Sequence, residues 1–223
     1  MKKIIMVLLT VFAVLTLSSM VLATGTVAGT EVVEGTPVSG SSSTFGTVTA
    51  TGGDITEMDL TREAQTSYWQ AYFGTVSNVL TLWDNTDAVY EWSSAKNIEW
   101  VFLSNSSTVT WTSLGKGDVR VAEDTALGLT GLDNVNSTFT GSTHAAVNIE
   151  GNVLTANGAP SVLTLSKGGS DWTTALFSQG STAVYGGQVN VDNEAYDGST
   201  VDYQMMVPTD GTTRTYYVFV LVN

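Results

Sequence analysis

The amino-acid sequence predicts an all-β protein, built as a single antiparallel β-sandwich that is jelly-roll-like. The 223 residues include 34 Thr and 28 Val, and such β-branched side chains favour the pleated surface of a strand. From about residue 54 onward, apolar and polar side chains alternate with the period of two that is typical of half-buried strands. Gly, Asn and Asp residues interrupt the alternation at short intervals, as turns between the strands of a sandwich do.

Residues 1–23 have the three parts of a secretory signal peptide. Lys2 and Lys3 give a positively charged start, residues 4–17 form an apolar run, and small residues precede a cleavage point after Ala23. An uncleaved membrane anchor is the alternative, but this apolar run is shorter than the ~20 residues that span a bilayer as a helix. We therefore expect a secreted protein at the extracellular cell surface, with no membrane span after cleavage.

Residues 24–53 differ in composition from the rest of the chain. Gly, Ser and Thr dominate them, most of all at residues 39–44, and no apolar periodicity is present, which predicts a flexible leader. The alternative is that a part of the leader, such as residues 31–33 or 48–50, forms a strand that is donated to a neighbouring subunit. Residues 54–223 then form one β-sandwich domain, since about 170 residues are ample for a single core.

An aromatic block at residues 66–92 is expected to form three consecutive strands. A tight turn at residues 77–78 and an acidic turn at residues 84–87 divide the block into three segments rich in aromatic and β-branched residues. We therefore expect a meander in which each strand pairs with the next one along the chain.

Tryptophan is concentrated in and just after this block. Because aromatic side chains bury large areas, five of these residues are expected to pack on the inner face of one sheet. The alternative is that one or two of them form an exposed platform for sugar rings. The five residues, which fall within 43 positions, are Trp69, Trp83, Trp92, Trp100 and Trp111.

Three further strands are expected at residues 98–102, 109–112 and 201–205, because apolar and polar side chains alternate there. One short helix is expected within residues 123–131, where Ala and Leu follow acidic residues. Pro occurs only three times in the chain, which suits continuous strands and a single domain.

Three motifs carry a resemblance to a known group of proteins. Residues 68–76 have the sequence YWQAYFGTV, residues 196–208 have the sequence YDGSTVDYQMMVP, and residues 212–220 have the sequence TTRTYYVFV. In these motifs the chain resembles a group of exported archaeal β-rich surface proteins of unassigned activity. It departs from them at Ala71, where the group has Gly more often. The resemblance covers most of residues 54–223 and implies an exported β-rich protein, but it supplies no catalytic residue.

The charge of the chain restricts its partners. Removal of residues 1–23 leaves six Lys and Arg side chains against 21 Asp and Glu. Nucleic acids and anionic membranes are disfavoured as partners, since both require clustered Lys and Arg. Other envelope proteins, or further copies of this chain, are the partners that remain.

Composition also argues against an enzyme. The chain has no Cys, which excludes disulfides, thiolate metal sites and a cysteine nucleophile. Its one histidine, His144, lies among small residues, and no Gly-x-Ser-x-Gly motif presents a serine to it. We expect His144 to be a surface or loop residue and assign no catalytic residue.

Two kinds of binding or modification site are suggested by the loops. Asp192, Asn193, Glu194 and Asp197 place oxygen ligands suited to calcium in one loop, although Asp and Asn also favour turns for conformational reasons alone. A second such loop lies at residues 84–87. No other cofactor is expected. Two Asn-x-Ser/Thr triplets make candidate N-glycosylation sites of Asn105 and Asn136.

Together these features predict a non-enzymatic, exported structural or interaction protein of the cell surface. Two alternatives remain open. One is a subunit of an extracellular filament that assembles by strand donation. The other is a β-sandwich module that binds carbohydrate or calcium.

Overall fold

The computed structural model describes eight parts of the chain. They are residues 26–29, 32, 34–38, 65–77, 80–83, 87–92, 98–169 and 171–222. Strands dominate these parts, and every strand pair among them is antiparallel, which confirms the predicted all-β class. The predicted signal peptide and most of the predicted leader lie outside the described residues.

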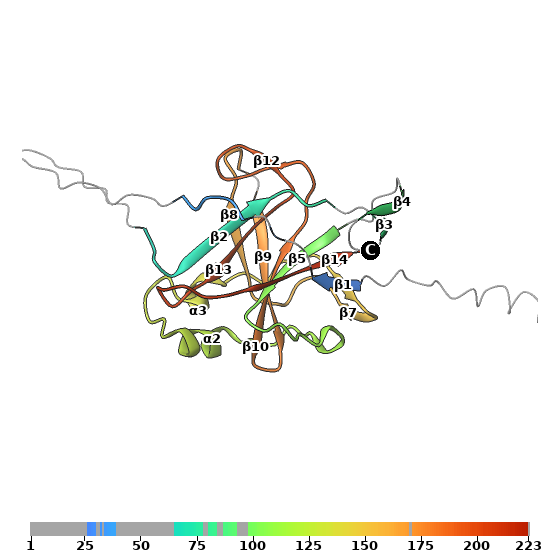
Figure 1. The fold of residues 1–223 in the computed structure, drawn as a ribbon. Helices are drawn as coiled ribbons and strands as arrows, with labels where there is room; N and C mark the ends of the chain where they lie inside the picture. Colours follow the sequence, from blue (N-terminus) through green and yellow to red (C-terminus); the bar gives the residue numbers. More distant parts are fainter. Residues whose placement is uncertain are drawn as a thin grey trace, which may run out of the picture.

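Six strands form the main sheet at the centre of the molecule (Figure 1). In the order in which they pair, they are β1 (Thr26–Gly29), β14 (Tyr217–Val222), β5 (Ile98–Ser104), β10 (Thr182–Gln188), β9 (Asp171–Gln179) and β8 (Ser161–Leu165). The first described strand of the chain and the last strand therefore pair at one edge of the sheet, and β8 forms the other edge.

A second, two-stranded sheet and two helices cover one face of the main sheet. β2 (Trp69–Gly74) pairs with β13 (Tyr203–Pro208), and α2 (Arg120–Leu127) and α3 (Val135–Thr138) complete this layer. Side chains from all four elements, or from residues next to them, share one apolar cluster with the main sheet. The arrangement is that of a sandwich whose second sheet is small.

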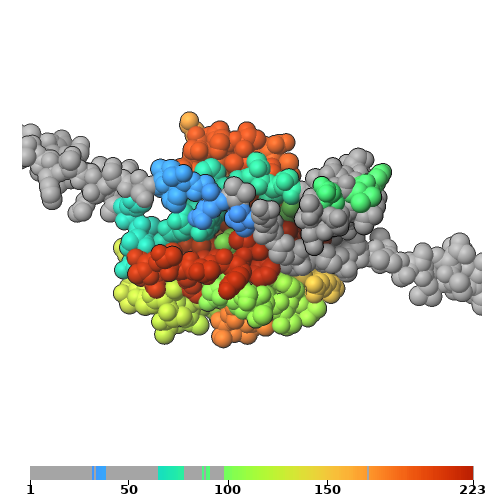
Figure 2. Space-filling model, viewed as in Figure 1, coloured from blue at the N-terminus to red at the C-terminus, as the bar shows by residue number. Residues whose placement is uncertain are grey.

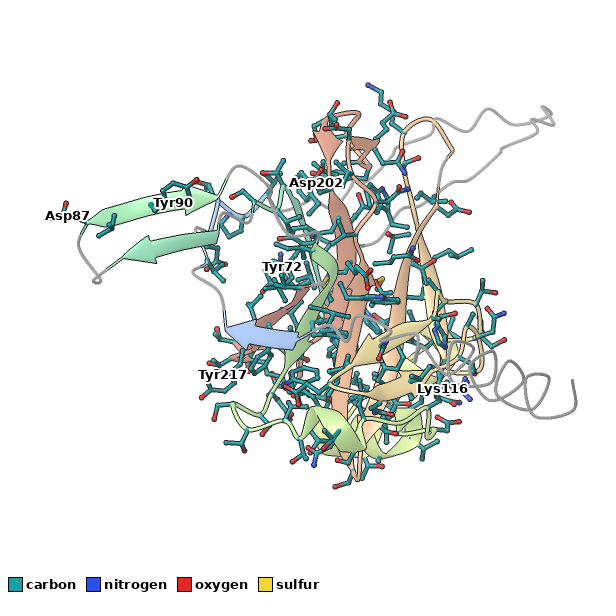
Figure 3. The ribbon with its side chains drawn as sticks, turned by 90° about the vertical axis from the view of Figure 1, so that its right-hand side faces the viewer. Tyr72, Asp87, Tyr90, Lys116, Asp202 and Tyr217 are labelled. Atoms are coloured by element: carbon teal, nitrogen blue, oxygen red, sulfur yellow. The ribbon has the colours of Figure 1, made fainter. Side chains whose placement is uncertain are left out.

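The opposite face is covered by η1 (Trp111–Ser113) and by the pair of β6 (Val147–Ile149) and β7 (Asn152–Leu154). Two further strand pairs lie outside these layers. They are β11 (Asn193–Glu194) with β12 (Thr200–Val201), and β3 (Leu80–Trp83) with β4 (Ala88–Trp92). The β3–β4 hairpin, on which Asp87 and Tyr90 lie, projects from the body of the protein (Figure 3).

The strand β5 is buried on both faces. Trp100 and Phe102 pack in the cluster that contains η1 and β6–β7, whereas Val101 and Leu103 pack in the cluster that contains β13. The prediction of a half-buried strand at residues 98–102 is therefore wrong. Both faces of the main sheet are covered, so both sets of alternating side chains in β5 lie in a core.

The predicted meander is only partly present. β3 and β4 pair as expected, but the partner of β2 is β13, with Trp69 opposite Pro208 and Gly74 opposite Tyr203. The residues that form β13 belong to the predicted strand at 201–205 and to its continuation. Alternation along one segment identifies a strand but carries no information on which strand lies beside it.

Two local predictions also differ from the structure. The expected strand at residues 109–112 is absent, and Trp111 instead begins the 3₁₀ turn η1. The expected helix at residues 123–131 is present as α2, which starts three residues earlier, at Arg120. α2 ends at Gly128, whose φ of +68° is the left-handed conformation that glycine adopts readily at a helix end.

The tryptophans do not share one face. Trp100 and Trp111 lie in one cluster, as expected, but Trp69 packs against the cluster on the opposite face of the main sheet. The sixth tryptophan, Trp172, is buried in a separate small cluster. The side chains of Trp83 and Trp92 lie outside the described residues.

The N-terminal segment contains more structure than its composition suggests. Residues 26–29, which were expected to belong to the flexible leader, form β1 and extend the main sheet. Among the described residues, no helix combines the length and the apolar content needed to cross a membrane.

Candidate functional site

The edge of the main sheet at β14 joins the two ends of the described chain. β1 lies antiparallel to β14, with Thr26 opposite Val222 and Gly29 opposite Phe219 (Figure 1). β5 pairs with β14 on its other side, from Tyr217 to Val222. The four residues of β1 cover only part of β14, and Tyr217, which is 45% exposed, lies beyond their end.

The opposite edge, at β8, is largely closed to further pairing. The N–H and C=O of Ser161 both bond to Gly141, at 2.9 Å each. A Cβ atom on Gly141 would lie 3.0 Å from the Ser161 carbonyl oxygen, so glycine permits this close approach. At the other end of β8, the carbonyl of Leu165 accepts a hydrogen bond from the Gln204 amide. A strand edge blocked in this way is protected against adding another strand.

Buried carboxylates tie loops to the layers. The carboxylate of Asp202, placed just before β13, accepts hydrogen bonds from the N–H of Val76 at 2.8 Å and of Asp192 at 3.0 Å (Figure 3). Asp124 of α2 likewise accepts from the N–H groups of Val135 and Asn136, which lie in the first turn of α3. Each carboxylate thus satisfies backbone donors that would otherwise be left without a partner.

His144, which was expected at the surface or in a loop, is buried, with 3% of its surface exposed. It does lie in a loop. Its Nε2 accepts a hydrogen bond from the N–H of Ala159, and this assigns the proton to Nδ1, which lies 2.7 Å from the carbonyl of Ala145. The ring packs edge-on against Phe177. Both ring nitrogens are therefore engaged by the backbone.

A buried ion pair joins α2 to the segment before β14. A guanidinium nitrogen of Arg214 lies 2.9 Å from the Glu123 carboxylate, and the side chains are 15% and 6% exposed. The Arg214 guanidinium also lies over the ring of Tyr216, whose hydroxyl donates a hydrogen bond to the carbonyl of Pro208. The sequence does not predict this ion pair, because Glu123 and Arg214 belong to unrelated segments of the chain.

The same ion pair borders two tyrosines with shifted pKa values. Burial is the main reason that the pKa of Tyr185 lies well above its ordinary value, and the neighbouring Glu123 carboxylate raises this pKa further. Burial also raises the pKa of Tyr216, while the Arg214 guanidinium lowers it in part. Both hydroxyls are therefore held in the protonated form by their surroundings.

The predicted calcium ligands have local hydrogen-bond partners. The Asp197 carboxylate accepts from the N–H and the hydroxyl of Ser199, at 2.9 and 2.6 Å, and these bonds lower the pKa of Asp197. The side-chain oxygen of Asn193 accepts from the N–H of Glu194. Asp192 has a φ of +57°, and its N–H is bonded to Asp202. Calcium binding by this loop stays a prediction.

No group of three or more His, Asp or Glu residues that could hold a metal ion occurs in the part of the chain that the structure describes. Of the second predicted loop, residues 84–86 lie outside the described residues. Asn105 and Asn136, the candidate glycosylation sites, are both exposed. Asn105 directly follows β5, and Asn136 lies in α3.

One exposed aromatic pair lies beside β13. The rings of Phe73 and Tyr196 meet edge to face, with centroids 5.2 Å apart, and the residues are 39% and 53% exposed. Gln204 positions both of them, because it lies opposite Phe73 in the strand pair and accepts a hydrogen bond from the N–H of Tyr196. Sequence reasoning considered aromatic platforms but did not single out these two residues.

No protein-family model, curated protein or solved structure matches this chain. The motifs at residues 68–76 and 196–208 do, however, contribute the two strands that pair with each other, β2 and β13.

Proposed function

We propose that this chain is an exported, non-enzymatic structural or interaction protein of the cell surface. The observation that carries the proposal is the use made of its buried polar side chains. Asp124, Asp202 and His144 each bond backbone groups of the surrounding loops or helices. In many secreted proteins, disulfides join distant segments of the chain. This chain has no cysteine, and these hydrogen bonds join its distant segments instead.

Export is supported by the signal-peptide pattern of residues 1–23. The excess of acidic residues supports a role among envelope components, where net negative charge keeps a protein soluble. Other envelope proteins or copies of the same chain are its partners under this proposal.

The location and processing can be tested together. The protein is recovered from separated surface, culture-medium and cytoplasmic fractions of the native cell, and its N-terminus is determined by mass spectrometry. We expect a chain that starts at Thr24 in the surface or medium fraction. A chain that keeps residues 1–23 and stays in the cytoplasmic fraction would overturn the proposal.

Carbohydrate binding is a second candidate function, and the exposed pair of Phe73 and Tyr196 favours it. Exposed aromatic faces can stack on sugar rings. Under this candidate, surface polysaccharide fragments change the tryptophan fluorescence of the protein, and Tyr196→Ala abolishes the change. Tyr217→Ala, which removes an exposed ring at the far edge strand β14, is the matched control. A panel of glycans without any response removes this candidate.

Calcium binding has its own measurement. Binding to the folded state raises the melting temperature by mass action. If Asp192, Asn193, Glu194 and Asp197 bind calcium, the melting temperature is higher in calcium than in chelator, and Asp197→Asn reduces the difference. Equal melting temperatures in the two conditions contradict the calcium prediction.

A further inference from the structure

We propose that β1 is exchanged between copies of this chain, so that β1 of one copy pairs with β14 of another. This inference rests on the proposed function, in which copies of the chain are partners, and it identifies the contact between them. Strand addition at a sheet edge uses backbone hydrogen bonds, so the same pairing can form within a chain or between two chains.

A long stretch of sequence separates β1 from the rest of the protein. Residues 30–64, which number 35, separate β1 from the segment at residues 65–77 that contains β2, and of these 35 residues the structure describes residue 32 and residues 34–38. A connection of this length spans at most about 120 Å when fully extended. It is therefore long enough for β1 to reach the edge of an adjacent copy.

The described residues that follow β1 are held weakly. Residue 32 and residues 34–38 are all exposed, with Val32 at 56% and Val38 at 87%. In Figure 2 the blue residues 34–38 lie on the surface against the teal residues 65–77, where the Glu34 carboxylate contributes to the raised pKa of Tyr72. No large apolar side chain of this described stretch is buried, so little burial energy opposes its release.

β14 needs a partner on its outer edge. β14 contains the apolar run from Val218 to Val222, and β5 pairs with only one of its two sides. Without β1, the outer N–H and C=O groups of this strand would have no strand partner. An unpaired apolar edge invites association with another chain, and β1 is the segment whose register with β14 is already defined.

The two edges of the main sheet determine the geometry of the assembly. Because both ends of the β8 edge are already bonded, to Gly141 and to Gln204, the β14 edge is the better place for the main sheet to take up a strand once β1 leaves it. Each copy then gives one strand and receives one. Such a head-to-tail contact between different surfaces extends into a chain of copies, unless two copies exchange strands reciprocally and form a closed dimer.

The test uses the absence of native cysteine. Thr26→Cys is placed in one population of the secreted chain and Val222→Cys in a second, differently tagged population, since these positions are opposite each other. The two are unfolded together, refolded, oxidised and separated on a denaturing gel. The matched control pairs Thr26→Cys with Tyr217→Cys, a position on β14 that β1 does not reach.

If strands are exchanged between copies, the Thr26→Cys chain forms a covalent heterodimer with the Val222→Cys chain. No such heterodimer forms between the Thr26→Cys chain and the Tyr217→Cys chain. The amount of the heterodimer increases with protein concentration, because pairing within a chain does not depend on concentration and pairing between chains does. The double variant Thr26→Cys/Val222→Cys then gives dimers or longer covalent ladders.

The inference is overturned if the double variant gives only internally linked monomers at every concentration and the mixed single variants give no heterodimer. Circular dichroism of each variant confirms that it folds, and a second route avoids substitution in β14 altogether. For that route, a chain lacking residues 24–29 is mixed with a labelled peptide of residues 24–32, which must bind if the edge accepts a strand in trans. A surface-located protein whose β1 stays in its own chain would contradict exchange but leave the proposed function standing.

Discussion

The Glu123 carboxylate lies 2.9 Å from the guanidinium of Arg214, and this ion pair is enclosed between α2 and the segment that leads into β14. Since β14 carries β1 on its outer edge, the ion pair helps to hold the strand at which the chain's two described ends meet.

Removal of one charge from this pair is expected to be strongly destabilising. Glu123→Gln leaves the Arg214 guanidinium buried without its counter-charge, which costs about 3 kcal/mol of unfolding free energy. Urea unfolding followed by circular dichroism measures the change. The matched control is Asp118→Asn, which breaks the more exposed pair with Arg120 and should cost less than about 1 kcal/mol. If the two variants lose the same amount of unfolding free energy, the buried pair has no special stabilising role.

Asp202→Ala is expected to loosen the end of β2. The substitution leaves the N–H groups of Val76 and Asp192 without their acceptor, at a cost of about 2 kcal/mol or more. Hydrogen exchange at the amide of Val76 should accelerate. Asp210→Ala, whose exposed carboxylate accepts hydrogen bonds from the N–H and hydroxyl of nearby Thr212, serves as control and should leave this amide unchanged. An unchanged exchange rate in Asp202→Ala would show that the carboxylate is dispensable.

Gly186→Ala is expected to destabilise the centre of the main sheet. A Cβ atom at this position of β10 would lie 2.9 Å from the ring of Phe177 and 3.0 Å from that of Phe102. Overpacking of this kind costs about 1–3 kcal/mol. At Gly74 the nearest atom would be 3.6 Å away, so Gly74→Ala provides a control with little steric cost. The midpoint of urea unfolding should fall only in the first variant, and equal midpoints would contradict the predicted clash.

Stability is expected to fall in alkaline solution because of Tyr185. Its pKa in the fold lies above the ordinary value of 10.0, so the fold keeps the proton where the unfolded chain releases it. Tyr185 therefore contributes stability that is complete below about pH 10 and is lost as the pH rises through the higher pKa of the folded state.

Unfolding free energies measured between about pH 9 and 11 test this effect. Tyr185→Phe removes the hydroxyl and should give a flatter alkaline decline than the unmodified protein. Identical slopes for Tyr185→Phe and the unmodified protein would rule out this contribution.

The sequence predicted the class of the fold because strands and turns are encoded locally. Pairing is not, and for this reason the β2–β13 partnership was missed although both segments were expected to be strands. Residues 109–112 also show how little a short pattern decides. Alternation over four residues fits a strand, but it fits equally a turn that buries Trp111, which is what the structure contains.

The polar interior was still harder to predict. His144 has small neighbours in the sequence, and it is buried because Ala159 and Phe177, which are distant in the sequence, pack around it. The ion pair of Glu123 and Arg214 likewise depends on how α2 packs beside the C-terminal segment. Composition identified an acidic chain with few candidate catalytic groups, but the bonds made by each group follow from the tertiary fold.

The central claim, that this is a structural protein of the cell surface, is tested most directly by immunogold electron microscopy of intact native cells. We predict gold particles on the outer surface of cells that carry the gene, and their loss in cells from which the gene has been deleted. Label confined to the cytoplasm of sectioned cells, with none on the surface, would contradict the claim.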